Sequence, residues 1–237
     1  MTLSIAATDI TALRERCGVA VLRTVRADPA YENGAVLPTG PWTSITDDTA
    51  QDLVASSPIG DSTLVELVKP PVPAEALSSL IQRLGDPEAI HLGQARAPMD
   101  VLTTTRNHEN DGYRIGLHVD NWDRLPYATK HTGRRRICIN LGPGTRYLLL
   151  ADLDIRTICR ALYQDYADRY PHTDDLRRYV GSGHTVLCYR IRLEPGEGYI
   201  APTELFPHDG STEGLLEPST AAFWLGHWPR GVLPSLI

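Results

Sequence analysis

Hydrophobic and polar residues alternate with a period of two from about residue 100 onward, which is typical of β-strands. Segments 113–120 and 136–141 place aliphatic and aromatic residues on one face and polar or small residues on the other. We expect further strands over the segments 146–153, 184–193, 196–202 and 220–228. Apolar outer faces and polar inner faces predict a sheet that curls around a functional cavity, as in a β-barrel or jelly roll.

The first hundred residues predict two helices and a strand between them. The first helix begins at Asp9 or Thr11, which are suitable N-capping residues, and ends at Arg16. A buried strand then covers 18–25, and the second helix covers 73–83. These elements precede the part of the chain in which the strand pattern dominates.

Four prolines indicate that segment 27–60 is rich in loops, and a third helix is expected over 155–169, between two strands. The chain therefore predicts a mainly β fold with flanking helices, of the α+β class, organised as one domain over 1–237. The N-terminal helices and the opening strand occupy 1–100. The jelly-roll core, with its inserted helix, occupies 101–237.

The composition is that of an ordinary globular protein, with 42% hydrophobic and 22% charged residues in a chain of 237. A net charge of −6 argues against a nucleic-acid-binding protein, which usually has a basic face. No apolar stretch is long enough to span a membrane, and the first residues lack the pattern of a secretory signal. Four widely spaced cysteines indicate buried free thiols in a reducing cytoplasm. We expect a cytoplasmic monomer or homodimer that acts on a small-molecule substrate.

Segment 101–150 departs from the acidic balance of the rest of the chain. It contains eight Lys and Arg residues against four acidic residues, so its net charge is +4 while the remainder carries −10. A cluster of this kind is either a solvated basic face or the wall of a pocket that binds an anion.

The tripeptide His118-Val119-Asp120 places an imidazole and a carboxylate on one face of a strand, because residues i and i+2 point the same way. A second histidine would complete a 2-His-1-carboxylate set with open coordination positions, as expected of non-haem Fe(II) oxygenases. His208 follows a strand and a proline-bearing turn, whereas His227 lies within the last strand and is expected to face the apolar outer layer. We therefore prefer His208 as the third ligand.

The HxD motif and the segment PGEGYIAPTELFPHDG at 195–210 resemble the Fe(II)/2-oxoglutarate-dependent dioxygenase superfamily. The apolar strand that begins at residue 18 is also similar to the first strand of those enzymes. The resemblance implies a double-stranded β-helix, a jelly roll of the cupin-like kind. It also implies that His118, Asp120 and His208 are the catalytic iron ligands, with Fe(II), 2-oxoglutarate and O2 as cofactors.

The same resemblance implies hydroxylation or another oxidation of a small molecule, such as an amino acid or a natural-product intermediate of secondary metabolism. 2-Oxoglutarate would be consumed with release of succinate and CO2. Halogenation is disfavoured, because Asp120 stands where related halogenases carry a small residue. Desaturation and cyclisation stay open beside hydroxylation.

Members of this superfamily commonly place an arginine at the start of the last strand, where it pairs with the distal carboxylate of 2-oxoglutarate. This chain has Pro-Ser-Thr-Ala-Ala-Phe there, without an arginine. A guanidinium still suits a carboxylate best, since its donors can bind it in a bidentate manner. We predict as the anchor, in decreasing order, Arg146, Arg136 and Arg230, with Asn140 as a further cofactor-binding residue.

Four residues are candidates for contacts with a substrate. Trp122 and Tyr127 follow the HxD motif and would form a wall of the pocket, unless they are packing residues. Glu204 is placed to meet a cationic group, and Arg114 lies on the same predicted face as the HxD motif. Asp209, next to a predicted ligand, is expected to support a ligating imidazole through a hydrogen bond.

Two other classes of protein are compatible with these residues. A cupin-like metalloenzyme would bind Zn, Mn or Fe through the same ligands without 2-oxoglutarate, and the missing arginine favours it. A non-catalytic, small-molecule-binding jelly roll would use His118 and Asp120 structurally. In the first case 2-oxoglutarate would leave the spectrum of the metal unchanged. In the second, no stoichiometric metal would copurify with the protein.

Overall fold

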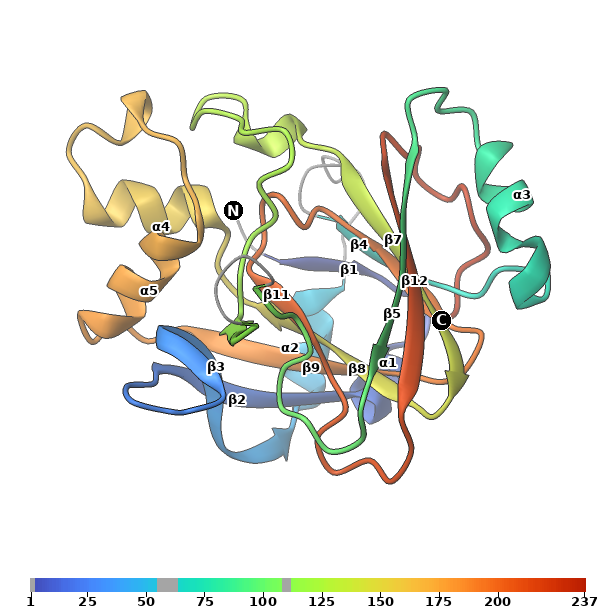
Figure 1. Ribbon diagram of the computed structural model, residues 1–237, viewed down its shortest axis with the longest axis horizontal. Coiled ribbons are helices and arrows are strands. Elements are labelled where there is room, and N and C mark those ends of the chain that lie inside the picture. Colours follow the sequence, from blue (N-terminus) through green and yellow to red (C-terminus); the bar gives the residue numbers. More distant parts are fainter. Residues whose placement is uncertain (1–2, 55–63, 108–111) are drawn as a thin grey trace.

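Two six-stranded sheets make up most of the computed structural model, which describes residues 3–54, 64–107 and 112–237 (Figure 1). The first sheet has the order β1 (Ser4–Ala6), β4 (Leu64–Val68), β10 (Gly198–Ala201), β7 (Arg135–Pro143), β12 (Ser219–Gly226) and β5 (Ile90–Ala97). The second has the order β11 (His208–Ser211), β8 (Arg146–Ala151), β9 (Leu187–Leu193), β2 (Cys17–Thr24), β3 (Tyr31–Ser44) and β6 (Arg114–Gly116). Both sheets are mixed, because β1 pairs with β4, and β3 with β6, in parallel.

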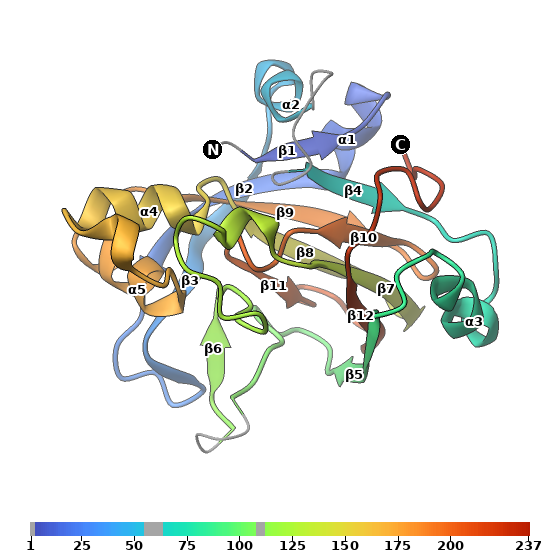
Figure 2. The ribbon, with the colours of Figure 1, turned by 90° about the horizontal axis from the view of Figure 1, so that it is seen from above.

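The two sheets enclose the larger hydrophobic core, and one of them has a nearly closed, barrel-like shape (Figure 2). Val65 and Tyr199 enter this core from the first sheet, and Leu22 and Leu148 enter it from the second. The mainly β architecture with flanking helices agrees with the prediction from the sequence. Among the described residues, no helix has the length and apolar character needed to cross a bilayer.

Strand β7 confirms the predicted alternation of inward and outward side chains. Cys138 belongs to the core between the sheets, whereas its neighbours Ile137 and Ile139 belong to a second apolar cluster. Leu77 and Ile81 of α3 (Leu77–Gln82) complete that second cluster, so α3 covers the outer face of the first sheet. The short 3₁₀ turn η2 (Ala74–Ala76) precedes α3, and together they match the predicted helix over 73–83.

The other helices lie on the opposite side or at the N-terminus (Figures 1 and 2). Helix α1 (Ile10–Arg16) begins as predicted, with the side chain of Asp9 accepting a hydrogen bond from the amide of Ala12 at 2.9 Å. The helix predicted over 155–169 is shorter than expected. It comprises α4 (Ile155–Leu162), because Tyr163 adopts an extended conformation, and the turn η4 (Tyr166–Asp168) and helix α5 (Thr173–Gly181) follow.

The prediction of a loop-rich segment 27–60 is wrong for its described part, which contains β3 and α2 (Asp47–Leu53). Residues 55–60 of that segment lie outside the described residues. Strand β3 accommodates Pro38 and Pro41 because β6 pairs with it only as far as Val36. Beyond Val36 no described strand pairs with this edge of β3, and prolines are tolerated at such an edge.

The strand predicted over 113–120 is also shorter, since β6 ends at Gly116. Gly116 has φ +72°, a left-handed conformation that interrupts a strand. The chain then continues to His118 and Asp120, so both predicted ligands lie just beyond the strand end. The sequence pattern did not predict strands β1, β4, β5 and β11.

Candidate metal centre

Backbone hydrogen bonds bring the predicted ligands together. His118 forms an isolated antiparallel bridge with His208, the first residue of β11. The amide of His118 donates to the carbonyl oxygen of His208 at 3.1 Å, and the reciprocal hydrogen bond measures 2.8 Å. Two residues further along, the amide of Asp120 donates to the carbonyl oxygen of Thr203 at 2.9 Å. Segments 90 residues apart in the chain therefore meet at one place.

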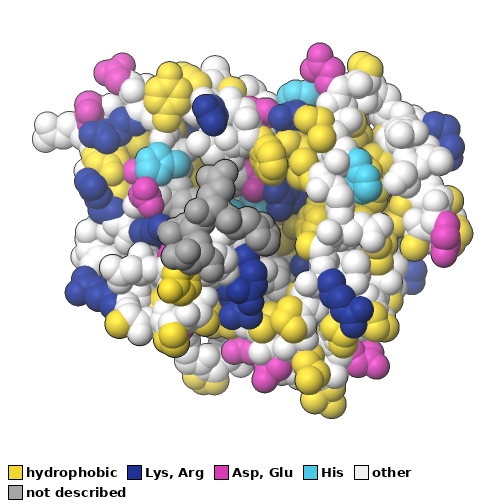
Figure 3. Space-filling model, in the orientation of Figure 1, with side chains coloured by type: hydrophobic (Ala, Val, Ile, Leu, Met, Phe, Trp, Pro, Cys, Tyr) yellow, Lys and Arg dark blue, Asp and Glu magenta, His cyan; other side chains and the backbone are white. Residues whose placement is uncertain are grey.

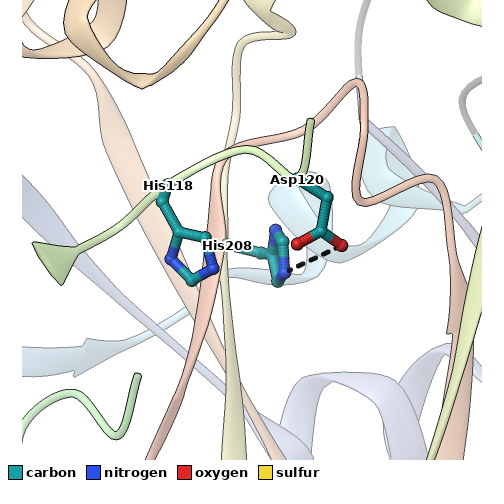
Figure 4. Close-up of side chains that lie close together, drawn as sticks. All are labelled: His118, Asp120 and His208. Carbon is teal, nitrogen blue, oxygen red and sulfur yellow. Dashed lines mark ion pairs between the residues drawn. The ribbon is translucent and has the colours of Figure 1, made fainter. Parts of the chain in front are cut away.

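The three side chains point toward one another inside the protein, as Figure 4 shows. One potential ligand atom from each lies within 4.8 Å of the other two. Nε2 of His208 is 3.9 Å from Oδ2 of Asp120, and the two imidazole centroids are 4.7 Å apart. All three side chains are buried. This His-Asp-His cluster is compatible with a 2-His-1-carboxylate metal site.

Hydrogen bonds fix which imidazole atoms face the cluster. Nδ1 of His118 donates to the carbonyl oxygen of Gly116 at 3.0 Å, and Nδ1 of His208 donates to that of Phe206 at 3.2 Å. A carbonyl oxygen only accepts, so Nδ1 carries the proton on each ring and Nε2 has a free lone pair. Among the described residues, Nε2 of His208 and Oδ2 of Asp120 are buried without a hydrogen-bond partner. Leaving such atoms unpaired is costly, and a metal ion would satisfy both.

Arg136 forms an ion pair with Asp120 through Oδ1, whereas Oδ2 is the carboxylate oxygen near His208. Its Nη2 lies 2.7 Å from Oδ1 of Asp120, and its guanidinium lies over the ring of Phe223. Burial tends to raise the pKa of Asp120, but the charge of Arg136 is the largest of the opposing effects, and the pKa is lowered to about 2. Burial lowers the pKa of His208 to about 3. The carboxylate is therefore ionised and this imidazole neutral, which are the forms that bind metals.

Asp209 is buried next to His208, and hydrogen bonds hold one oxygen of its carboxylate. Its Oδ1 accepts hydrogen bonds from the amides and hydroxyls of Thr104 and Thr105 and from the amide of Gly210. Its Oδ2 lies 3.8 Å from Nδ1 of His118. This separation is beyond hydrogen-bond range, and Oδ2 has no hydrogen-bond partner among the described residues, so the expected hydrogen bond from Asp209 to a ligating imidazole is absent there. Burial raises the pKa of Asp209.

Arg146, the first candidate anchor, is a buried arginine at the start of β8. It forms no ion pair with any described residue, and its guanidinium packs against Gly210, where a Cβ atom would collide with it. Burial raises the pKa of Tyr199 well above its usual value, while the nearby charges of Arg136 and Arg146 oppose this rise. The charges of both guanidiniums therefore act on Tyr199, which belongs to the core between the sheets.

Asn140 does not face the metal cluster with a free amide group. Its Nδ2 donates to the carbonyl oxygens of Gly144 and Leu193 at 3.0 and 3.1 Å. Its Oδ1 accepts from the amide of Gly142 and the hydroxyl of Ser219, both at 2.9 Å. These four hydrogen bonds use the full capacity of the amide. The expected role in binding a carboxylate is therefore replaced by a structural role in the turn between β7 and β8.

Arg230 is exposed and lies elsewhere on the molecule. It lines a surface groove of about 480 Å³ with residues of β1, β4 and the C-terminal segment, such as Leu64 and Leu233. No residue of the His-Asp-His cluster lines this groove. His227, the other candidate third ligand, is likewise exposed and stands apart from the cluster.

The four candidate substrate residues differ in their surroundings. Trp122 is 57% exposed, and Tyr127 packs against Tyr166, with ring centroids 4.8 Å apart. Arg114 lies over the ring of Tyr31, 5.9 Å from its centroid. Glu204 is buried and carries an internal ion pair, so its carboxylate already has a cationic partner. The structure does not bring these four side chains together in a single wall.

Sequence reasoning missed the partner of Glu204, which is Lys130. Its ammonium is 2.9 Å from Oε2 of Glu204, and the lysine side chain is fully buried. Lysine is seldom fully buried, and Lys130 lies in a polar segment that predicts a solvated residue. Nothing in the sequence pattern indicated its burial.

Figure 3 shows histidine, acidic and basic side chains at the bottom of a hollow near the centre of the face it displays. The prediction of a polar inner face is wrong for most of the interior, where Leu22, Val65 and Leu148 pack in the larger hydrophobic core. Comparison with known proteins adds no assignment, since no family model matches the chain and no curated protein is significantly similar to it.

Proposed function

We propose that this protein is a non-haem Fe(II)- and 2-oxoglutarate-dependent oxygenase with a double-stranded β-helix core. The observation that carries the proposal is the buried cluster of His118, Asp120 and His208. Their outward-facing polar atoms are already bonded, whereas Nε2 of His208 and Oδ2 of Asp120 face each other without a hydrogen-bond partner. This donor set suits Fe(II) and leaves coordination positions open for other ligands.

The three cluster residues and Arg136 would have different roles. His118, Asp120 and His208 would bind the iron, and Arg136 would keep Asp120 ionised by its hydrogen bond to Oδ1. With 2-oxoglutarate, the bound metal would supply oxidation by O2 with release of succinate and CO2. The enclosing sheets would keep bulk water away from the site.

Arg146 is the anchor that we propose for the distal carboxylate of 2-oxoglutarate. A buried guanidinium without a carboxylate partner among the described residues is costly unless a bound anion pairs with it. Arg136 is less suited because it already pairs with Asp120, and Arg230 lies in a separate groove. The substrate would be a small molecule, such as an amino acid or a natural-product intermediate. The protein would be a cytoplasmic monomer or homodimer.

A cupin-like metalloenzyme that does not use 2-oxoglutarate is the second candidate. It is favoured by Ser219, which stands at the start of β12, where the resembling superfamily commonly has an arginine. The hydroxyl of Ser219 donates its hydrogen to Asn140, so that hydrogen is already used within the protein.

The test is an anaerobic titration of the apoprotein with Fe(II), followed by 2-oxoglutarate, with visible absorption recorded throughout. We expect one iron per chain and a weak charge-transfer band that appears only after 2-oxoglutarate is added. Asp120→Ala should abolish iron binding and succinate formation. Arg146→Met should bind iron normally but require at least about tenfold more 2-oxoglutarate, since a charge-assisted bidentate pair is lost.

Arg230→Met is the matched control, because it removes an exposed arginine far from the cluster and should change neither titration. Iron binding without a band would favour the cupin-like enzyme. A chain that binds no iron would leave only a non-catalytic binding protein.

A further inference from the structure

The loop that follows the carboxylate ligand is anchored to the protein interior by a buried ion pair. We call residues 121–134 the metal-side loop. It leaves Asp120 and returns to β7, and it contains the 3₁₀ turn η3 (Lys130–Thr132). Because Asp120 is its first attachment point, any displacement of the loop would move that carboxylate.

Lys130 directs all of its donors to the start of this loop and to the strand connection beside it. Its Nζ lies 2.9 Å from Oε2 of Glu204, 3.2 Å from Oδ1 of Asn121 and 3.5 Å from the carbonyl oxygen of Asp120. An ammonium group has three donors, so these contacts account for its full capacity. The side chain is completely buried and has no access to water.

Glu204 links the same loop to the segment that leads into β11. Its Oε1 accepts a hydrogen bond from the amide of Asp123 at 3.2 Å, while Oε2 binds Lys130. A Cβ atom at Gly133 would lie 2.8 Å from Cβ of Glu204, so the loop packs directly against this side chain. The ion pair between Arg134 and Asp123, at 2.6 Å, closes the loop on itself.

A buried ion pair of this kind is poor evidence for a gain in stability. Removing two charges from water is costly, and apolar pairs of similar volume are often as stable. The pair instead fixes the geometry of the loop. The ammonium of Lys130 contacts Asp120, its neighbour Asn121, and Glu204 in the segment between β10 and β11. Loss of a residue whose role is to fix this geometry should weaken metal binding more than it lowers the stability of the fold.

We propose that Lys130 and Glu204 are positioning residues, whose ion pair holds the metal-side loop so that the carboxylate of Asp120 faces the two histidines. This inference deepens the proposed function and rests on it for the identity of the bound group. The loop geometry itself can be tested in the metal-free protein.

The experiment compares Lys130→Met with wild type by hydrogen–deuterium exchange of the apoprotein and by titration with Co(II), a spectroscopic substitute for Fe(II). We expect amides of the metal-side loop to exchange at least about tenfold faster in the variant, since three contacts to the loop and its anchor are lost. The Co(II) dissociation constant should rise about 10- to 100-fold, as is usual when groups that orient metal ligands are removed.

Arg16→Met is the matched control. Arg16 forms an ion pair with Glu197 at 2.7 Å, so this variant also leaves a buried glutamate without its partner, but in a different part of the molecule. It should leave exchange in the metal-side loop and the affinity for Co(II) unchanged.

The double variant Lys130→Met/Glu204→Leu replaces the ion pair by two apolar side chains. We expect it to recover the unfolding midpoint of wild type while the loop stays in fast exchange and Co(II) binding stays weak. It also decides the question if Lys130→Met alone does not fold.

Unchanged loop exchange in a folded variant would overturn the inference, whether or not metal binds. Faster loop exchange together with a wild-type protein that binds no Co(II) would support the positioning of the loop and remove the proposed function instead. The two proposals can therefore fail separately.

Discussion

Buried polar side chains in this protein differ in whether their hydrogen bonds are complete. Asn140 has four partners and no capacity left, whereas His208 and Asp120 each present one buried atom without a partner among the described residues. An amide that is fully bonded indicates a structural role. Unbonded donor atoms that converge indicate a binding role, because their cost must be met by something bound.

The first prediction separates these two roles at residue 140. Asn140→Ala should lower the free energy of unfolding by about 2–4 kcal/mol, because it leaves buried donors and acceptors unpaired. Denaturation with urea measures this loss. Binding of Fe(II) and 2-oxoglutarate by the folded variant should be unchanged. A variant of normal stability that binds 2-oxoglutarate weakly would instead restore Asn140 to the cofactor site.

A second prediction concerns the buried thiols, which the sequence suggested and the structure confirms as free cysteines. Burial raises the pKa of Cys17 from 9.0 to about 12, although nearby Arg16 opposes the rise. Above pH 9 the unfolded chain therefore loses a proton that the folded chain keeps. The free energy of unfolding should fall with rising pH from about 9 to 12, by up to about 1.4 kcal/mol per pH unit for this thiol.

Urea titrations at pH 8, 9 and 10 measure this slope, and Cys17→Ala should reduce it. Below pH 9 both states keep the proton, so Cys17 should contribute no pH dependence there. A slope that is the same in wild type and in Cys17→Ala would contradict the assignment. Thiol reagents should label the folded protein slowly at pH 8, since the thiolate is the reactive form.

Residue patterns revealed the proposed ligands but not the charges around them. His118 and Asp120 stand two residues apart, so strand geometry alone predicts that they converge. The pairing of Arg136 with Asp120 and of Lys130 with Glu204 depends on long-range contacts that no local pattern encodes. Because the contact with Lys130 is not encoded locally, the sequence predicted that Glu204 would bind a cationic group of a substrate.

At the scale of elements, the cluster depends on how β6 ends. Gly116 lies against β3 with φ +72°, and its carbonyl oxygen accepts the Nδ1 proton of His118. A Cβ atom at Gly116 would lie 2.6 Å from the carbonyl oxygen of Val36. The end of β6 therefore both stops the strand and orients the first ligand.

The third prediction is that Gly116→Ala damages the fold and the metal site together. The left-handed conformation costs a non-glycine residue about 1–2 kcal/mol, and displacement of the β3 backbone adds to this loss of unfolding free energy. Because the carbonyl of Gly116 would move, Co(II) affinity should fall as well. Urea denaturation and a Co(II) titration measure the two effects.

Gly34→Ala, a glycine substitution in β3, is the control for Gly116→Ala. Gly34 also has a positive φ, +81°, but a Cβ atom there would meet nothing within 4 Å. It should therefore show only the conformational cost, with Co(II) affinity unchanged. Equal losses in the two variants would show that the contact with β3 has no role.

Elements with a clear hydrophobic period were predicted well, and those without one were not. Strand β7 alternates, whereas β11 reads His-Asp-Gly-Ser and owes its existence to pairing with β8. Strand β3 was missed because its prolines favour a loop unless the strand edge is known. Sheet edges are a property of the tertiary fold, so the sequence of β3 alone does not contain this information.

At the scale of the whole molecule, the site joins the two sheets. His208 and Arg146 belong to the second sheet, on β11 and β8, whereas Arg136 reaches Asp120 from β7 of the first. Tyr199, also from the first sheet, lies near both arginines. Ligands bound at this place would therefore connect the two halves of the core.

The last prediction follows from this connection. Ligands that bind only the folded state stabilise it by about 2.7 kcal/mol each at 100 times their dissociation constant. For a chain of this length, such a gain raises the melting temperature by about 5–10 °C. Anaerobic Fe(II) should therefore raise the melting temperature of wild type, and 2-oxoglutarate should raise it further only when Fe(II) is present.

Two variants distinguish the effect of Fe(II) from that of 2-oxoglutarate in this thermal assay. Asp120→Ala should show neither shift, because the metal ligand is lost, and Arg146→Met should show the Fe(II) shift alone at the same 2-oxoglutarate concentration. The melting temperature of each unliganded variant corrects for its own change in stability. A 2-oxoglutarate shift that persists in Asp120→Ala would mean that the anion binds independently of the metal, which contradicts the expectation that 2-oxoglutarate acts only when Fe(II) is present.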